Sequence, residues 1–222
     1  MELSPLQRDF LRTFTKNPLS KKFYWTGGTL LSVRYLQHRI SFDLDFFTNG
    51  DLNREVITRF VRNFAKKRKL KLEEHRTKDR LEFFIQNKKE VRIDFASYEY
   101  PAIHKRRRWR GINVDSCDDI AANKVVALMD RDDPKDIFDL YCLCVFEKYT
   151  IDKLLNLVLK KFSLQFTALT ILSRADYVAK GLSTLVPHII HKKGKVRKNI
   201  RGAIQKWIRT ESDRFLDRNL ND

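Results

Sequence analysis

Two aspartates, Asp43 and Asp45, are separated by one residue in an otherwise apolar stretch of the 222-residue chain. If this stretch is a β-strand, both carboxylates point to the same face of a sheet, about 6.5–7 Å apart along the strand. Two carboxylates this close repel each other unless a cation lies between them. Oxygen ligands suit Mg²⁺ or Mn²⁺. The pair therefore indicates a divalent metal site or, alternatively, an exposed acidic face on an edge strand.

A third aspartate, Asp94, repeats the pattern in the apolar stretch 91–96. If the two strands are neighbours, three carboxylates converge on one face of the sheet. Such a cluster suits two-metal phosphoryl transfer, in which one ion activates the attacking oxygen and both stabilise charge on the phosphate. The alternative is that Asp94 is a surface residue of its strand.

A glycine pair, Gly27-Gly28, followed by Thr29, stands between a short apolar stretch and a helical pattern. Glycines allow the backbone to approach a phosphate, and the N–H groups and dipole of a helix start favour an anion. A tight turn explains a Gly-Gly pair equally well. The stronger indication is the combination of this turn with the aspartate pair, which begins 15 residues after Gly28.

Charged residues outside these strands add to the candidate site. Lys124 and Asp136 are twelve residues apart, across a helix end, a loop and the first turn of the next helix. The helix dipole favours an aspartate in a first turn, so simple helix-start chemistry is the alternative for Asp136. For Lys124 and Asp139 the alternative is an exposed side chain on a helix.

The residues just before Asp43 carry polar side chains with two interpretations each. Arg39 is predicted to bind phosphate or to form a structural ion pair with a carboxylate. Ser41 is predicted to donate a hydrogen bond to phosphate or to cap the entry of the strand. For His38 a structural role is favoured over that of a general base.

The order of these motifs resembles the nucleotidyltransferase superfamily of the DNA polymerase beta type. Within it, the strings 25–35 and 38–47 are similar to the AbiEii/AbiGii toxin branch, which includes the MenT-type transferases of toxin–antitoxin systems. A second similar block is Asn123–Leu128, followed by Arg131 and by Lys135–Leu140, where Lys135 replaces a common arginine. The resemblance covers residues 23–141, and beyond residue 150 only the helical character matches.

The resemblance implies a role for each matching position. Asp43 and Asp45 would be metal ligands, and Asp94 would be the third acid, which contacts the metal and orients or deprotonates the attacking hydroxyl. Lys124 would contact the triphosphate, and Asp136 would complete the site. The nucleotide- and phosphate-binding set would comprise Gly27, Gly28, Thr29, Arg39, Ser41 and Lys124. The substrate would be an NTP and the cofactor Mg²⁺ or Mn²⁺.

Periodicity and turn residues predict an α+β fold of the polymerase-beta-like type, with a mixed sheet of four or five strands followed by a helical bundle. Residues 1–115 are expected to form the nucleotidyltransferase core. Residues 116–222 are expected to form a helical domain whose first two helices, 116–147, complete the active site. Strands are predicted at 23–26, 42–47, 70–75, 81–86 and 91–98, and helices at 5–17, 30–36, 51–69, 116–130, 134–147, 151–163, 165–179 and 197–217, with a loop at 181–195.

Composition excludes several classes of protein. The 42% hydrophobic and 12% aromatic residues suffice for a packed core, and 7 glycines and 5 prolines exclude collagen-like and low-complexity chains. Three cysteines without a CxxC pair indicate reduced thiols rather than a disulfide scaffold or zinc site. Neither an apolar run long enough for a membrane helix nor a signal-peptide pattern occurs, so a cytoplasmic protein without membrane contact is expected.

The chain is strongly basic: 45 Lys and Arg against 28 Asp and Glu give a net charge of +17. Such a charge favours a polyanionic partner. One basic run, 66–69, lies at the end of a predicted helix, where the helix dipole favours positive charge. Two other basic stretches, around residues 105–110 and 192–197, are candidates for binding such a partner. Trp109 is predicted either to stack on a base or to pack in the core. The candidate RNA-binding residues are Lys105, Arg106, Arg107, Arg108, Arg110, Lys192, Lys193, Lys195 and Arg197, for which a solvated surface is the alternative.

The leading functional hypothesis is transfer of a nucleoside monophosphate from an NTP to the 3′ end of tRNA, by a toxin with a cognate antitoxin. One alternative is nucleotidylation of a protein or of a small-molecule hydroxyl. The other is a nucleotide- or RNA-binding module without turnover, which clustered carboxylates that repel RNA argue against.

Overall fold

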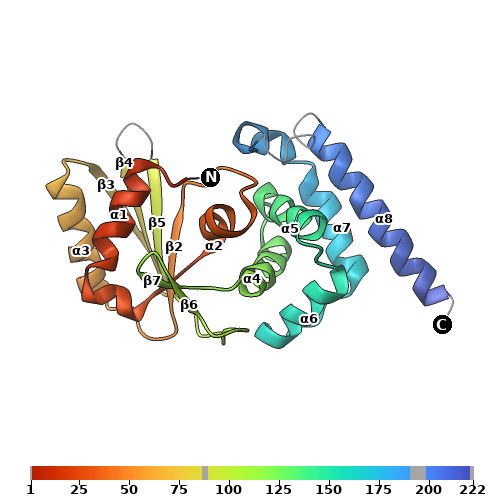
Figure 1. The fold of residues 1–222 in the computed structure, drawn as a ribbon, viewed down its shortest axis with the longest axis horizontal. Helices are drawn as coiled ribbons and strands as arrows, with labels where there is room; N and C mark the ends of the chain where they lie inside the picture. The colour runs from red at the N-terminus through yellow and green to blue at the C-terminus, as the bar shows by residue number, and fades with distance from the viewer. Residues whose placement is uncertain (1, 87–89, 191–198, 221–222) are drawn as a thin grey trace. The chain divides into compact units, whose positions relative to one another are not determined.

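A computed structural model describes residues 2–86, 90–190 and 199–220 of the chain (Figure 1). The chain divides into two compact units. Unit 1 comprises residues 1–35 and 41–116, and unit 2 comprises residues 36–40 and 117–222. The short segment 36–40 therefore belongs with the helical unit, although it lies early in the chain. None of the described helices is long and apolar enough to cross a membrane.

Unit 1 is built on a seven-stranded mixed sheet with the strand order β3-β4-β5-β2-β1-β7-β6. The central strand β2 runs parallel to β5 and antiparallel to β1, and β1 runs parallel to β7. With the helices that follow, this sheet confirms the predicted α+β class. The strands are β1 (Tyr24–Thr26), β2 (Leu44–Thr48), β3 (Lys71–Arg76), β4 (Arg80–Gln86), β5 (Glu90–Ser97), β6 (Arg107–Trp109) and β7 (Ile112–Val114).

One face of this sheet is covered by α1 (Pro5–Thr15) and α3 (Arg54–Lys67), which lie on the same side of it in Figure 1. Helix α1 starts where the sequence predicts, because Ser4 and Gln7 cap each other's backbone N–H groups. Its apolar stripe packs on the sheet, with the Phe14 ring centroid 4.7 Å from that of Phe46 and 5.5 Å from that of Phe95. A short 3₁₀ helix, Pro18–Lys22, leads from α1 to β1.

The hairpin of β6 and β7 adds two strands to the predicted number. Its turn residues, Arg110 and Gly111, both have positive φ, 49° and 84°. These angles fit the tight hairpin turns that follow the twist of the strands. Each strand has only three residues, and Arg-Gly is a weak turn signal, so the sequence pattern did not indicate a hairpin here.

A second difference concerns the start of the acidic strand. The predicted strand covers 42–47, whereas β2 begins at Leu44. Asp45 therefore lies on the strand, and Asp43 lies on the irregular segment that leads into it. The helix predicted after the glycine pair starts earlier, with α2 (Gly27–Leu30) continuing into the π-helical turn η2 (Leu31–Leu36).

Unit 2 is helical, and three of its helices start at side-chain caps. Asp133, Thr150 and Thr167 each accept a hydrogen bond from a backbone N–H in the first turn that follows. The predicted loop 181–195 includes a 3₁₀ helix, and the predicted start of the last helix lies outside the described residues. The elements are α4 (Cys117–Asp130), α5 (Pro134–Phe146), α6 (Ile151–Phe162), α7 (Ala168–Ala179), η3 (Leu182–His188) and α8 (Ile200–Leu220).

Candidate active site

A row of polar residues crosses the sheet of unit 1 at one level. Thr26 on β1 is paired with Asp45 on β2, Asp45 with Asp94 on β5, and Asp94 with Glu82 on β4. Because these residues are in register, their side chains leave the sheet on one face. This is the face opposite to the aromatic core, since Asp45 alternates with the buried Leu44 and Phe46. We call these four residues the acidic row.

Asp94 is the most buried acid of the row, with 1% of its surface exposed. Burial raises its pKa to about 7, and the neighbouring Asp45 carboxylate adds to the rise. Among the described residues, its Oδ1 atom has no hydrogen-bond partner. A buried carboxylate oxygen without a partner is costly, so this atom is available for a ligand.

Two arginines that the sequence analysis did not single out lie beside these acids. Arg92 Nη2 is 3.3 Å from Asp43 Oδ2 and 3.4 Å from Asp94 Oδ2. Arg80 Nη1 is 3.7 Å from both Asp94 and Glu82. The guanidinium of Arg92 thus joins two of the three predicted metal ligands. Glu82 was also missed, and only the strand register reveals it, because nothing local sets it apart from other strand glutamates.

The glycine pair is held against the acidic row. Gly27 has a φ of +79°, and a Cβ built on it would lie 1.9 Å from Asp45 Oδ2. Both facts require glycine at this position. Thr29 is fully buried, and its hydroxyl donates a hydrogen bond to the Asp43 carbonyl. The Thr29 side chain therefore fixes the backbone of the aspartate motif.

The site offers a divalent cation two carboxylates in place of the predicted three. In the described ranges, no group of three His, Cys, Asp or Glu side chains is arranged to hold a metal ion. Two carboxylates, those of Asp45 and Asp94, do lie directly opposite each other, and one of them has a buried oxygen without a partner. Mg²⁺ commonly binds one or two carboxylates together with substrate phosphates, so this pair fits such an ion.

In unit 2, the candidate residues meet in a buried ionic network centred on Asp139. Arg39 binds the Asp139 carboxylate with two hydrogen bonds, of 2.6 and 2.8 Å, and His38 Nε2 lies 2.6 Å from the same group. Lys124 Nζ is 2.8 Å from Asp139 and 2.6 Å from Asp136. Burial alone would raise the pKa of Asp139, but Arg39 and Lys124 more than offset it and hold that pKa well below its usual range.

The network overturns two of the alternatives considered from sequence. Asp139 is not an exposed helix residue, and Lys124 is not solvated: their exposed fractions are 0% and 7%. Burial alone would lower the pKa of Lys124, but Asp139 and Asp136 raise it, so its ammonium stays charged. Asp136 also binds the half-exposed Arg131, whose Nε is 2.7 Å from Asp136 Oδ2.

The residues before the acidic strand divide between the two units. Arg39 makes the structural ion pair that was one of its two predicted roles, and His38 shares that carboxylate. Ser41 belongs to unit 1, where it is buried and its carbonyl accepts a 3.1 Å hydrogen bond from Gln7 Nε2.

The basic stretch 105–110 leads into the β6–β7 hairpin and forms its first strand and its first turn residue. Arg106 is partly buried, where it donates a 2.8 Å hydrogen bond to Asp115 and stacks on the Tyr24 ring. Trp109 stacks on Trp25 with ring centroids 5.6 Å apart, so one of its faces is covered. Lys105, Arg107, Arg108 and Arg110 are exposed, whereas Lys192, Lys193, Lys195 and Arg197 lie outside the described residues.

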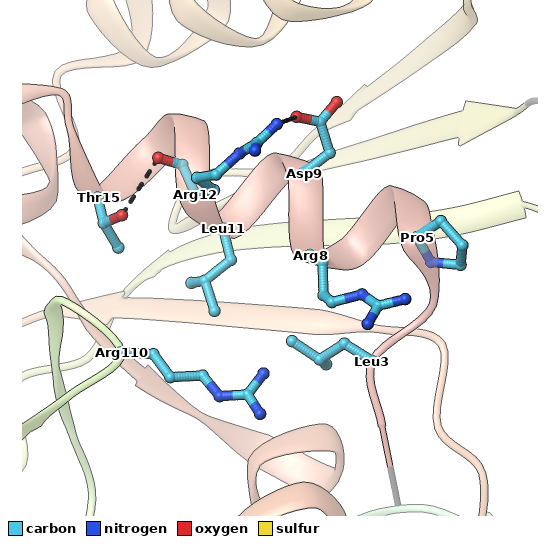
Figure 2. A pocket seen from close by; sticks show the side chains of 8 residues that line it. All are labelled: Leu3, Pro5, Arg8, Asp9, Leu11, Arg12, Thr15 and Arg110. Carbon is cyan, nitrogen blue, oxygen red and sulfur yellow. Dashed lines mark hydrogen bonds and ion pairs between the residues drawn. The ribbon is translucent and has the colours of Figure 1, made fainter.

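Arg110 reaches a hollow of about 480 Å³ beside α1. Figure 2 shows Leu3 between the side chains of Arg8 and Arg110, while Arg12 turns away to pair with Asp9. The exposed end of the hairpin and the first helix thus carry guanidinium groups around one apolar patch.

Comparison with known proteins identifies the family. The family model of the nucleotidyl transferase AbiEii toxin, from type IV toxin–antitoxin systems, matches residues 9–218. The chain belongs to the AbiEii family. It is therefore a toxin-class nucleotidyltransferase, an enzyme whose substrate is a nucleotide and whose system includes an antitoxin.

Two further similarities agree with membership of the AbiEii family. An uncharacterized protein of Aquifex aeolicus strain VF5 is 31% identical over 165 residues, which cover 72% of this chain and 76% of that protein. The crystal structure of JHP933 from Helicobacter pylori superposes with a TM-score of 0.51 at 20% identity, covering 100% of both chains. At this identity the structural likeness concerns the fold alone.

Proposed function

We propose that this AbiEii-family enzyme is metal-dependent and transfers a nucleoside monophosphate from an NTP to the 3′ end of tRNA. The observation that carries the proposal is the pairing of Asp45 with Asp94, whose buried Oδ1 has no partner among the described residues. Clustered carboxylates contribute nothing to binding a polyanion, since they repel it. Their presence favours catalysis over simple RNA binding.

In the proposed reaction, the 3′-hydroxyl oxygen attacks the α-phosphorus, and the bond to the bridging oxygen of the β-phosphate breaks. Pyrophosphate leaves with the electron pair of that bond. Asp94 orients the attacking hydroxyl and accepts its proton. Asp45 and Asp94 would hold Mg²⁺ or Mn²⁺, which would stabilise the charge on the phosphate.

The glycine turn supports the binding of phosphate in this proposal. Because Gly27 has no side chain, its backbone lies against the Asp45 carboxylate. A phosphate held by the backbone N–H groups of Gly27 and Gly28 would then meet Asp45 at close range. In unit 2, Asp136 and Asp139 keep the ammonium of Lys124 charged and oriented, which agrees with the phosphate-binding role that the family resemblance implies for it.

A tRNA acceptor is supported by the charge of the protein. The net charge of +17 and the exposed arginines of the β6–β7 hairpin favour a partner with many phosphates over a small neutral acceptor. A toxin that blocks the 3′ end of tRNA would stop aminoacylation and growth, which agrees with membership of a toxin family.

A labelling assay tests the proposal. The protein is incubated with total tRNA, Mg²⁺ and each of the four α-labelled NTPs, beside Asp45→Asn and the exposed control Asp51→Asn. Label is expected in tRNA with the unaltered protein and the control, but not with Asp45→Asn. Label found only in a protein or a small molecule would show that the acceptor is not tRNA. If no component of a lysate becomes labelled, the proposal is overturned.

A further inference from the structure

Helices α1 and α3 enclose a hollow of about 470 Å³ on the helical face of unit 1. It lies on the side of the sheet opposite to the acidic row, because α1 packs on Phe46 and Asp45 points the other way from β2. None of the lining residues is acidic. The lining includes Lys16, Arg59, Phe60, Asn63, Lys67 and Arg68. We call this the α1–α3 hollow.

Most of the positive charge in the α1–α3 hollow is not neutralised. Arg68 is paired with Asp9. The other three cations, Lys16, Arg59 and Lys67, are exposed and form no ion pair with any described residue. By contrast, another arginine of α3, Arg62, is neutralised by an ion pair, because its Nε lies 2.6 Å from Glu74 Oε1. Three like charges around one hollow repel one another, so an anion bound there lowers the free energy of the folded protein.

The spacing along α3 suits a chain of phosphates. Arg59, Asn63 and Lys67 are four residues apart, so they form one stripe about 12 Å long on the helix surface. A second hollow, of about 450 Å³, shares Arg59 and Asn63 with the first. It also contains Arg54, Arg62 and Arg76, but Glu55 lines it as well, and Arg62 and Arg76 are both paired with Glu74, so the cations without ion pairs are concentrated in the α1–α3 hollow.

We propose that the α1–α3 hollow binds the phosphodiester backbone of RNA. Phosphate contacts by Lys and Arg hold nucleic acid without reading its sequence. A protein partner fits less well. The centres of protein interfaces are apolar and contain few lysines, whereas this hollow is lined by several cationic side chains. This inference rests on the proposed function, because the partner is taken to be RNA on the ground that tRNA is the proposed acceptor. RNA bound here contacts the protein away from its reacting 3′ end.

The experiment compares two charge reversals of equal size. Arg59→Glu with Lys67→Glu alters the hollow, and Lys160→Glu with Arg209→Glu alters exposed positions on α6 and α8. The dissociation constant for fluorescent total tRNA is measured by anisotropy between about 50 and 200 mM salt. The hollow variant is expected to bind about tenfold or more weakly at low salt, with a salt slope shallower by about 1 for each lost phosphate contact.

The control variant should stay within about twofold of the unaltered protein at each salt concentration. Equal losses in both variants would show that only net charge matters, and no loss in the hollow variant would show that RNA binds elsewhere; either overturns the proposal. Thermal melting checks folding, and Arg59→Gln with Lys67→Gln repeats the test without adding negative charge. Binding of polyglutamate, a mimic of an acidic protein, is measured beside that of tRNA. If the hollow variant loses polyglutamate binding but binds tRNA normally, the proposal is overturned in favour of an acidic protein partner.

The labelling assay separates this proposal from the proposed function. If tRNA binding depends on the hollow but no NTP labels tRNA, the hollow binds RNA and the acceptor assignment fails. If tRNA is labelled and the hollow variants bind it normally, the nucleotidyl transfer stands and this inference fails.

Discussion

Asp45 and Asp94 lie directly opposite each other on the neighbouring parallel strands β2 and β5. Like charges in this position are destabilising, and burial of Asp94 adds to the cost. The arginines 80 and 92 offset part of it. The proposed nucleotidyl transfer gives this pair a role, since a bound divalent cation would offset the repulsion between the two carboxylates.

Asp94→Asn is expected to lower the rate of nucleotidyl transfer by about 10²- to 10⁴-fold, since an amide cannot accept the proton of the attacking hydroxyl. Glu82→Gln, in the same row, should keep most of the activity because Glu82 pairs with Arg80 at the outer side of Asp94. Steady-state rates with the labelled NTP measure both. Equal losses would show that the whole row, not Asp94, supports the reaction.

Arg92→Gln should affect the protein most when no metal is present. Asp43 and Asp94 then lose the cation that lies 3.3 and 3.4 Å from them. The metal-free variant is expected to unfold at a lower temperature, and Mn²⁺ should raise its melting temperature more than that of the unaltered protein. The control is Arg62→Gln, in which the exposed Arg62 loses its ion pair with Glu74, and it should show no such dependence on Mn²⁺. Identical Mn²⁺ responses in all three proteins would contradict the expectation.

Gly27→Ala is expected to be strongly destabilising. The new Cβ would meet Asp45 Oδ2 at 1.9 Å on a backbone with a φ of +79°, so the turn or the aspartate must move. The strained backbone alone costs about 1–3 kcal/mol. Gly50→Ala is the matched control, because its Cβ would find its nearest neighbour, Thr48 Oγ1, at 3.9 Å. Urea unfolding of both variants measures the difference, and equal free energies of unfolding would refute the assigned contact.

Local patterns were sufficient to predict the elements that carry the site. The helix that begins at Pro5, the glycine turn and the alternation around Asp45 all appear in the structure where the sequence indicates them. These features depend on neighbours within a few residues. The β6–β7 hairpin was missed because its strands are short and its pairing with β1 joins residues about ninety positions apart, such as Tyr24 and Asn113.

The contacts within the sites could not be predicted in the same way. Arg92 and Glu82 gain their positions from strand register, which no local pattern specifies. The burial of Asp139 depends on His38 and Arg39, about 100 residues earlier in the chain. A helix acid beside a loop looks exposed until the segment that covers it is known.

Asp139→Asn should destabilise the fold by about 3–5 kcal/mol, because Arg39 would remain buried without its carboxylate. The matched control is Asp152→Asn, which breaks a 2.8 Å ion pair with Arg218 in which both side chains are more than half exposed. Exposed pairs contribute about 0–1 kcal/mol, so the control should unfold almost like the unaltered protein. Urea denaturation compares the three proteins. A loss below about 1 kcal/mol for Asp139→Asn would contradict the network as described.

The same network predicts how stability depends on pH. Burial lowers the pKa of His38 below 6.5, against the opposing effect of Asp139, and the cations Arg39 and Lys124 lower it further. In the unfolded chain His38 binds a proton below about pH 6.5, whereas in the folded protein it binds one only at a lower pH. The unfolded state then binds more protons, so the contribution of His38 to stability is complete above pH 6.5 and declines as the pH falls.

Between about pH 8 and about pH 5.5, His38 should therefore lower the free energy of unfolding, measured with urea, toward the acid value, by up to about 1.4 kcal/mol per pH unit, while Asp94, whose pKa is raised to about 7, acts in the opposite direction in the same window. Asp139 and Asp136, whose pKa values are lowered, contribute their losses only below about pH 3.8, outside this window. His38→Gln should raise the free energy of unfolding at about pH 5.5 relative to that at about pH 8, whatever its effect on absolute stability. His75→Gln, at an exposed histidine, should leave the difference between the two pH values unchanged. If His38→Gln keeps the full pH dependence, the proton uptake occurs at another group.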